Sequence, residues 1–363
     1  MLLLRLHYDD SLEWFLNMAV SAGSSSDQCW RGTDKELKAK AMRARFLSLL
    51  LFLLLASSGA QDSPLFSGSK RIALTVQPVA VEGIPHARLF RPLGGWILSS
   101  DDPDFGGLSA LTVGKRGLTA VADTGVMVDF ARDWRAARIA SLPRACVPHQ
   151  LKRERDSESL ARDPSTNQVW IGFEYRNLLC RIDPGGSAKA YAPPSMKDWP
   201  KLGGPEAMVR RADGRFLVFA EKAAGGGATT PLLLFDRDPV LPKARVIAMR
   251  YRTFPGYHPS DAAMLPDGRM LVLNRRYVFP LSFSAIVTLV EPFTAKPGAL
   301  VEGRPVIVLA PPHIADNFEG MDVETQGSRT FLWLVSDDNF LPQQRSYLLK
   351  FELVASRSGG DGH

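Results

Sequence analysis

The strongest constraint on the fold of this chain is a pattern that recurs along it. Its clearest copy is Asn317–Phe351, which has an acidic opening, a turn containing glycine, an apolar strand, a polar cluster and a closing strand. The openings of the successive copies are Ser109, Glu158, Glu206, Asp261 and Glu319, which lie 49, 48, 55 and 58 residues apart. A period of this size indicates a repeat architecture.

The pattern of strands and turns in each copy predicts a small antiparallel sheet. The opening strand is followed by a turn such as Asp213-Gly214 or Asp267-Gly268, and then by an apolar strand that ends in a polar residue. The runs Ala244–Met249 and Pro305–Leu309 have the apolar character of outer strands. Four-stranded units arranged about an axis form a β-propeller. We therefore expect an all-β fold, a β-propeller with five blades, with six blades as the alternative.

The last copy contains only three strands before the pattern ends. We expect an N-terminal strand, either Arg71–Val76 or Trp96–Ser99, to supply the missing strand and close the ring. Closure matters because a loose seam would leave unpaired strand edges. The lead-in before the first copy is also long enough to form part of a sixth blade.

The N-terminal region predicts export. A mainly apolar run of ten residues, 46–55, follows the basic residues Arg43 and Arg45 and precedes the small residues Ser58 and Ala60. This is the pattern of a signal peptide at 42–60, and ten residues are too few to cross a bilayer, which needs about 20. We predict translation from Met42, a doubtful extension at 1–41, and a periplasmic or secreted protein with no stable membrane span. Residues 61–355 should form one domain and 356–363 a disordered tail.

Composition excludes several kinds of site. The formal charge of +6 is spread without a Lys/Arg-rich run, so we expect no nucleic-acid partner. The chain has no GxSxG, P-loop, GxGxxG, HExxH or CxxC motif. Of three cysteines, Cys146 and Cys180 lie in the predicted mature chain, and both a disulfide and two buried free thiols fit the sequence.

Acidic residues recur at both ends of the first hairpin of each copy. In an antiparallel pair the start of one strand and the end of the next lie together, so these carboxylates should gather at one mouth of the propeller. Hard oxygen donors suit Ca²⁺, which takes about 6 to 8 of them. The predicted ligands of a divalent ion, with Ca²⁺ as first choice, are Glu158, Glu206, Asp261, Glu319 and Asp337.

The predicted catalytic residues are Glu174, Arg176, Glu221, Lys222, Arg275, Asp338 and Arg345. One carboxylate would serve as base for water, and Arg176 and Arg345 would hold the anionic part of the substrate. The alternative is a structural role, because polar residues at strand ends also bond to loop amides.

Three segments resemble the phytase-like family of exported bacterial proteins, which are described as having esterase-like activity: FGGLSAL…AVADTG, SESLARDPSTNQVWIGFEYRN and FEGMDVETQGSRTFLWLVSDDNFLPQQRSYLLKF. The resemblance covers about residues 70–353. It implies a propeller and, through kinship with propeller phytases, a metal-assisted phosphoester hydrolase. Together with the acidic mouth, it leads us to expect an exported, metal-assisted hydrolase of phosphate or carboxylic esters. The chain departs from the pattern at Ser159, where the last copy has glycine, and at Asp261 and Asn274, which replace Glu-type acids.

Two other functions stay open, a lactonase-type propeller and a non-catalytic propeller that binds a ligand or a partner. For the hydrolase we expect a small-molecule ester or phosphoester substrate and a monomeric protein.

Overall fold

The computed structural model describes residues 69–354, except residues 86, 88, 115–116, 132, 149–150 and 281. The predicted extension, signal peptide and tail lie outside the described residues. All described residues fall in one compact unit, Ser63–His363. Among them, no helix is long and apolar enough to cross a membrane.

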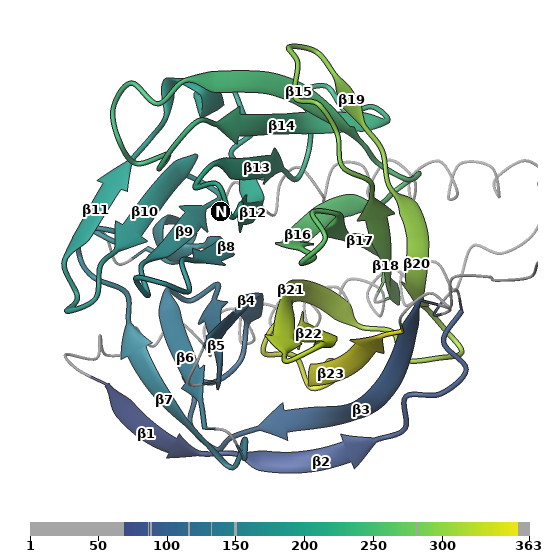
Figure 1. Cartoon of the computed structure of the whole chain (residues 1–363). Helices are drawn as coiled ribbons and strands as arrows, with labels where there is room; N and C mark the ends of the chain where they lie inside the picture. The colour runs from purple at the N-terminus through teal and green to yellow at the C-terminus, as the bar shows by residue number, and fades with distance from the viewer. Residues whose placement is uncertain are drawn as a thin grey trace, which may run out of the picture. The chain divides into compact units, whose positions relative to one another are not determined.

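Five mainly antiparallel sheets are arranged about a central axis, as Figure 1 shows. Blade 1 contains β4 (Leu108–Gly114), β5 (Gly117–Ala122), β6 (Val126–Phe130), β7 (Ala136–Ser141) and β1 (Lys70–Ala73). Blade 2 contains β8 (Ser157–Arg162), β9 (Val169–Phe173), β10 (Leu178–Ile182) and β11 (Ala188–Tyr191). Blade 3 contains β12 (Pro205–Arg210), β13 (Phe216–Ala220), β14 (Thr229–Phe235), β15 (Val246–Arg252) and the short parallel strand β19 (Leu300–Val301).

Blade 4 contains β16 (His258–Met264), β17 (Met270–Val278), β18 (Ser282–Val290) and β20 (Arg304–Leu309). Blade 5 contains β21 (Asn317–Gln326), β22 (Arg329–Asp337), β23 (Ser346–Leu353), β3 (Phe90–Ser99) and β2 (Thr75–Val79). The described helical segments are one turn each, α3 (Lys152–Arg155) and a 3₁₀ turn at Pro194–Met196. The predicted all-β, five-bladed propeller is therefore confirmed.

The ring closes as the sequence predicts, with a correction of detail. Strand β3, which contains the predicted Trp96–Ser99, pairs with β23 along eight residues. The other candidate, Arg71–Val76, is divided between two blades, because β1 pairs with β7 of blade 1 and β2 pairs with β3 of blade 5. The N-terminal segment thus supplies outer strands on both sides of the seam.

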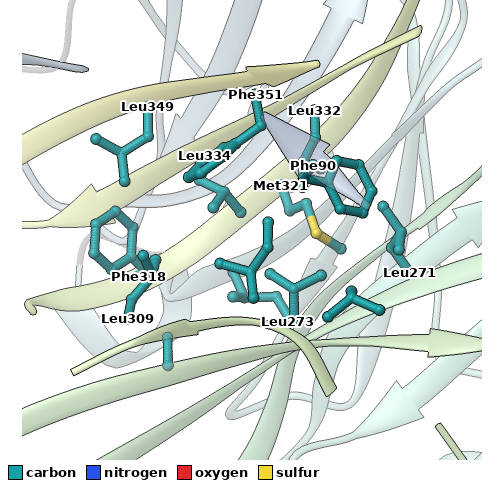
Figure 2. Packing of buried hydrophobic residues seen from close by; sticks show 14 of the residues in the cluster. Phe90, Leu271, Leu273, Leu309, Phe318, Met321, Leu332, Leu334, Leu349 and Phe351 are labelled. Atoms are coloured by element: carbon teal, nitrogen blue, oxygen red, sulfur yellow. The ribbon is translucent and has the colours of Figure 1, made fainter. Parts of the chain in front are cut away.

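Apolar layers between neighbouring blades hold the ring together. Along β17, Leu271 and Leu273 face the layer shared with blade 5, whereas Met270 and Val272 face the layer shared with blade 3. Burial on both faces explains why the strands are almost continuously apolar rather than alternating. Figure 2 shows the layer between blades 4 and 5, where Phe90 of the closing strand packs with Phe351 and Met321.

A disulfide ties the long β7–β8 connection to blade 2. Cys146 in that connection bonds to Cys180 in β10, with Cα atoms 5.5 Å apart. The structure thereby decides between the two alternatives left open by the sequence. The same connection carries α3 and runs directly into β8, so the disulfide helps to position the residues that enter the mouth.

Candidate functional site

The five innermost strands, β4, β8, β12, β16 and β21, each carry a β-bulge at the same place near their start. A bulge leaves one residue without a partner in the ladder and changes the direction of its side chain. The bulged residues, which we call the first ring, are Ser109, Glu158, Glu206, Ser260 and Glu319.

A second set of residues lies on or directly after the adjacent strand of each blade, one position after the residue that pairs with the residue before the bulge. Its members, which we call the second ring, are Asp123, Glu174, Glu221, Arg275 and Asp337. Backbone hydrogen bonds show that these positions are equivalent in blades 1, 2 and 3. The N–H groups of Asp123, Glu174 and Glu221 each donate to the carbonyl of the residue just before the inner strand of their blade. The two rings share the mouth at which the inner strands begin, as antiparallel pairing predicts.

In blade 4 the bulge lies one residue before the position that the sequence pattern predicts for the opening acid. The bulge lies at Ser260, so Asp261 lies one position further along the strand. Its carboxylate accepts the N–H of Met321 at 2.7 Å and of Ala262 at 2.8 Å, and burial raises its pKa well above the ordinary value. The structure therefore places Asp261 inside the wall between blades, where it bonds to backbone, rather than with the predicted metal ligands.

Asn274 is displaced from the mouth in the same way. Its amide donates to the carbonyl groups of Val272 and Ile286 and its oxygen accepts from Tyr251. The second-ring position of blade 4 belongs instead to Arg275, a cation where the other four blades have carboxylates.

Blades 2 and 3 bring five carboxylates together. Oxygen atoms of Asp156, Glu158 and Glu174 all lie within 4.8 Å of one another, as do those of Glu174, Glu206 and Glu221. Glu174 belongs to both triads. We call these five residues the acidic cluster.

Burial and mutual repulsion shift the protonation of this cluster. Burial, with the neighbouring Asp156 and Glu221 carboxylates, raises the pKa of Glu174 to about 8. Burial and Asp123 raise the pKa of Asp156 to about 6. The pKa values of Glu158 and Glu206 are also raised well above the ordinary value, first by burial and then by neighbouring acids. Without a cation, the cluster therefore retains protons near neutral pH.

Three cations border the acids. A guanidinium nitrogen of Arg275 lies 3.3 Å from both Glu206 and Glu221, and another lies 3.2 Å from Glu319. Burial disfavours this cation, but the three carboxylates outweigh that effect and raise its pKa. Lys222 pairs with Glu221 at 2.5 Å, and Lys152 of α3 pairs with Asp123 at 2.9 Å.

The blade 5 side of the mouth is organised by an asparagine. Asn317 donates its amide N–H groups to Glu319 at 2.9 Å and to Asp337 at 3.3 Å. Burial raises the pKa of Glu319 to about 7 although Arg275 acts in the opposite direction. Asp338, a predicted catalytic residue, accepts the N–H of Gly107 and the hydroxyl of Ser346, so it ties blade 5 to blade 1.

The structure does not bring Arg176 and Arg345 to the acids of the rings. Arg176 donates to the Cys146 carbonyl at 3.0 Å and lies 3.5 Å from Glu154. Arg345 is exposed and donates to the carbonyl groups of Pro342 and Gln344. Both arginines stabilise loops at this end of the propeller.

Sequence reasoning missed two site acids and one cation. Asp123 ends an apolar strand in the first copy, but that copy's opening is Ser109, which hid its place in the second ring. Asp156 precedes Glu158 by two residues, the spacing at which Asn317 precedes Glu319, and this spacing is a usable signal. Lys152 lies in α3, within the long β7–β8 connection, and no pattern in the sequence indicates its contact with Asp123.

A model of the phytase-like family, described as "esterase-like activity of phytase", matches residues 103–340. The chain belongs to this family. The resemblance found in the sequence is thus confirmed. A search of curated protein sequences finds no match.

Among solved structures, a Bacteroides thetaiotaomicron protein of unknown function has a TM-score of 0.43 and 10% identity, covering 78% of this chain and 76% of that one. A gluconolactonase from Xanthomonas campestris has a TM-score of 0.39 and 12% identity, covering 80% and 99%. A virginiamycin B lyase from Staphylococcus aureus has a TM-score of 0.34 and 13% identity, covering 72% and 73%. Similarities this distant carry no information about activity.

The acids of this phytase-like protein fit a hard cation. All five members of the acidic cluster offer carboxylate oxygens, which Ca²⁺ prefers. Within the described residues, one oxygen each of Glu206, Asp123 and Asn317 is buried and accepts no hydrogen bond. Buried polar atoms nearly always have a partner, so these oxygens are consistent with a cation that completes the mouth.

A cavity of about 690 Å³ lies away from the mouth. It is lined by the start of β5, including Leu118, and by Arg162 at the far end of β8, so it opens at the opposite ends of the strands. Its other charged lining residues are Arg71, Arg138 and Asp129. Because no member of the two rings lines it, we place the candidate site at the mouth and not in this cavity.

Proposed function

We propose that this protein is a metal-assisted hydrolase of phosphate or carboxylic esters, with a divalent cation, Ca²⁺ as first choice, held by the acidic cluster. The observation that carries the proposal is the pair of carboxylate triads that share Glu174. Ionised carboxylates whose oxygens lie no more than 4.8 Å apart repel one another by at least about 3.5 kcal/mol at an effective dielectric constant of about 20. Folding tolerates such a cluster only when protons or cations occupy it.

The ligand assignment follows from which acids already have partners. Glu158 and Glu174 form no described ion pair with a cation, and Glu206 has one oxygen without a partner. Glu319, in contrast, is bonded by both Arg275 and Asn317. We therefore assign Glu158, Glu174 and Glu206 to the cation, with Asp156 and Glu221 at its sides.

The surrounding residues suit ester chemistry. A bound divalent ion would polarise a carbonyl or phosphoryl oxygen. Lys222 and Lys152, at the border of the mouth, are placed to attract the anionic part of a substrate, the role first predicted for Arg176 and Arg345. Glu319, held in place by Arg275 and Asn317, is the carboxylate we assign to accept a proton from water.

We propose export as part of this function. The Cys146–Cys180 disulfide supports it, because disulfides persist in oxidising compartments and are rare in the cytosol. The N-terminal residue of protein recovered from the native host should lie near Gln61. Recovery of a chain that still contains residues 1–41 would contradict the predicted signal peptide.

The decisive experiment measures Ca²⁺ binding and turnover on the same preparation. Protein freed of metal by chelation is titrated with Ca²⁺ by calorimetry, then assayed on phosphomonoesters, carboxylic esters and lactones with and without Ca²⁺. We expect one class to be hydrolysed only with Ca²⁺. Glu206→Gln should weaken Ca²⁺ binding about tenfold or more, because the amide keeps one oxygen ligand but loses the negative charge and the second oxygen.

The matched control is Glu302→Gln. Glu302 is an exposed carboxylate that pairs with Arg252 and directly follows β19, the outermost strand of blade 3, so its amide variant should bind Ca²⁺ like the wild type. Ca²⁺ binding without turnover of any substrate would favour the non-catalytic binding propeller. Turnover confined to lactones would favour the lactonase-type propeller, and turnover unaffected by chelation would exclude the metal-assisted mechanism.

A further inference from the structure

The β22–β23 loop holds an aromatic ring beside the mouth in a conformation that the backbone disfavours. Asn339 and Phe340 have φ angles of 47° and 53°. These angles lie in the left-handed region, where a bulky residue such as phenylalanine is an outlier. Residues with this backbone strain persist only where the surrounding structure holds them, often at functional sites.

Two acids of the mouth hold this turn. Asp337, a second-ring residue, accepts the N–H of Asn339 at 2.6 Å. Asp338 accepts the N–H of Phe340 at 3.1 Å and that of Gly107, in blade 1, at 3.0 Å. The position of the Phe340 side chain is therefore coupled to Asp337 of the second ring and to Gly107 of blade 1.

The Phe340 ring packs over a glycine that leaves room for it. A Cβ atom on Gly107 would lie 2.8 Å from Phe340 Cε2 and 2.4 Å from Asp123 Oδ1. The two atoms are thus no more than 5.2 Å apart, the sum of these distances. Asp123 is a second-ring acid, and this oxygen is buried without a hydrogen-bond partner. The aromatic edge and the acids consequently share one border of the mouth.

Packing does not explain why residue 340 is a phenylalanine. Phe340 is 43% exposed and Leu341, next to it, is 42% exposed. Phe340 belongs to none of the apolar layers of the described chain. The positive φ costs stability and the partly exposed side chain gains little from burial, so folding alone does not account for a phenylalanine at this position.

We propose that Phe340 is a specificity-determining residue that contacts a flat apolar group of the substrate, which identifies the substrate class as aryl esters or aryl phosphoesters. This inference rests on the proposed ester hydrolysis. An aromatic face or edge near a charged centre binds an aryl group well and a small aliphatic group poorly.

The test compares Phe340→Gly with wild type on matched substrates, phenyl and methyl acetate or phenyl and methyl phosphate. Glycine adopts the left-handed conformation freely. We expect kcat/KM for the phenyl substrate to fall about fivefold, through KM, while the value for the methyl substrate stays within about twofold of wild type. Phe340→Tyr should restore the phenyl preference. The melting temperature of Phe340→Gly should stay within about 3 °C of wild type.

Phe279→Ala is the matched control, because Phe279 is 80% exposed on the β17–β18 hairpin of blade 4. It should leave both substrates unaffected. Equal losses on phenyl and methyl substrates, or the same phenyl loss in Phe279→Ala, would overturn the role of Phe340. If wild-type protein hydrolyses no ester at all, the proposed function fails and this inference fails with it.

Discussion

In blade 4 the acid lies one residue beyond the bulge, and this single position makes it a structural carboxylate instead of one that faces the mouth. Ser260 occupies the bulge in blade 4, and the next residue, Asp261, bonds to the backbone of blade 5. The sequence shows an acid near the expected position but does not show where the bulge falls, because bulges depend on strand pairing. The presence of acids at strand ends could be predicted from the sequence. Which of them face the mouth and which lie in the wall between blades could not.

Asp261→Asn tests this division. Both carboxylate oxygens accept backbone N–H groups, and an amide nitrogen cannot replace one of them. We expect the substitution to lower the free energy of unfolding by about 1–3 kcal/mol, measured by urea denaturation, and to leave Ca²⁺ affinity unchanged in calorimetry. A large loss of Ca²⁺ affinity with normal stability would return Asp261 to the metal site.

At the scale of strands, the repeat pattern was sufficient to predict the blades because every strand must cover apolar layers on both faces. The predicted outer strands 244–249 and 305–309 correspond to β15 and β20. The division of 71–76 between β1 and β2 was not predictable, since both segments are short and their partners are distant in sequence.

The closing strand β3 offers a matched pair of substitutions. Phe90 is 1% exposed in the layer between blades 4 and 5, whereas Leu93 in the same strand is 40% exposed. Phe90→Ala should lower the free energy of unfolding by about 3 kcal/mol or more, from lost burial and a remaining cavity. Leu93→Ala should change it by about 0.5 kcal/mol or less. Equal effects in urea denaturation would show that β3 does not close the ring through its packing.

At the scale of the whole molecule, the charge of the mouth couples stability to pH. The folded-state pKa is about 6 for Asp156, about 7 for Glu319 and about 8 for Glu174, all above the ordinary carboxyl values of 3.8 and 4.5. Between about pH 4 and pH 8 these three groups therefore bind more protons in the folded protein than in the unfolded chain. Stability from these groups is lost as pH rises through their folded-state pKa values.

We predict that the metal-free protein becomes less stable as pH rises from about 5 to about 8, as measured by urea denaturation in the presence of chelator. His258, whose pKa is lowered first by burial, acts in the opposite direction, but it is one group against three. Saturating Ca²⁺ at pH 8 should restore the lost stability, because it binds the folded state. Higher stability at pH 8 than at pH 5 without metal would contradict the proposed protonation of the mouth.

The presence of Arg275 among four second-ring carboxylates gives the mouth a direction. A ring with the same charge at all five positions would present an approaching molecule with a field along the axis alone, and every rotation about that axis would be equivalent. One guanidinium in blade 4, opposite Asp123 and Glu174 of blades 1 and 2, adds a field component across the ring. A molecule with a negative end and a neutral end would then have unequal energies at the five rotations about the axis.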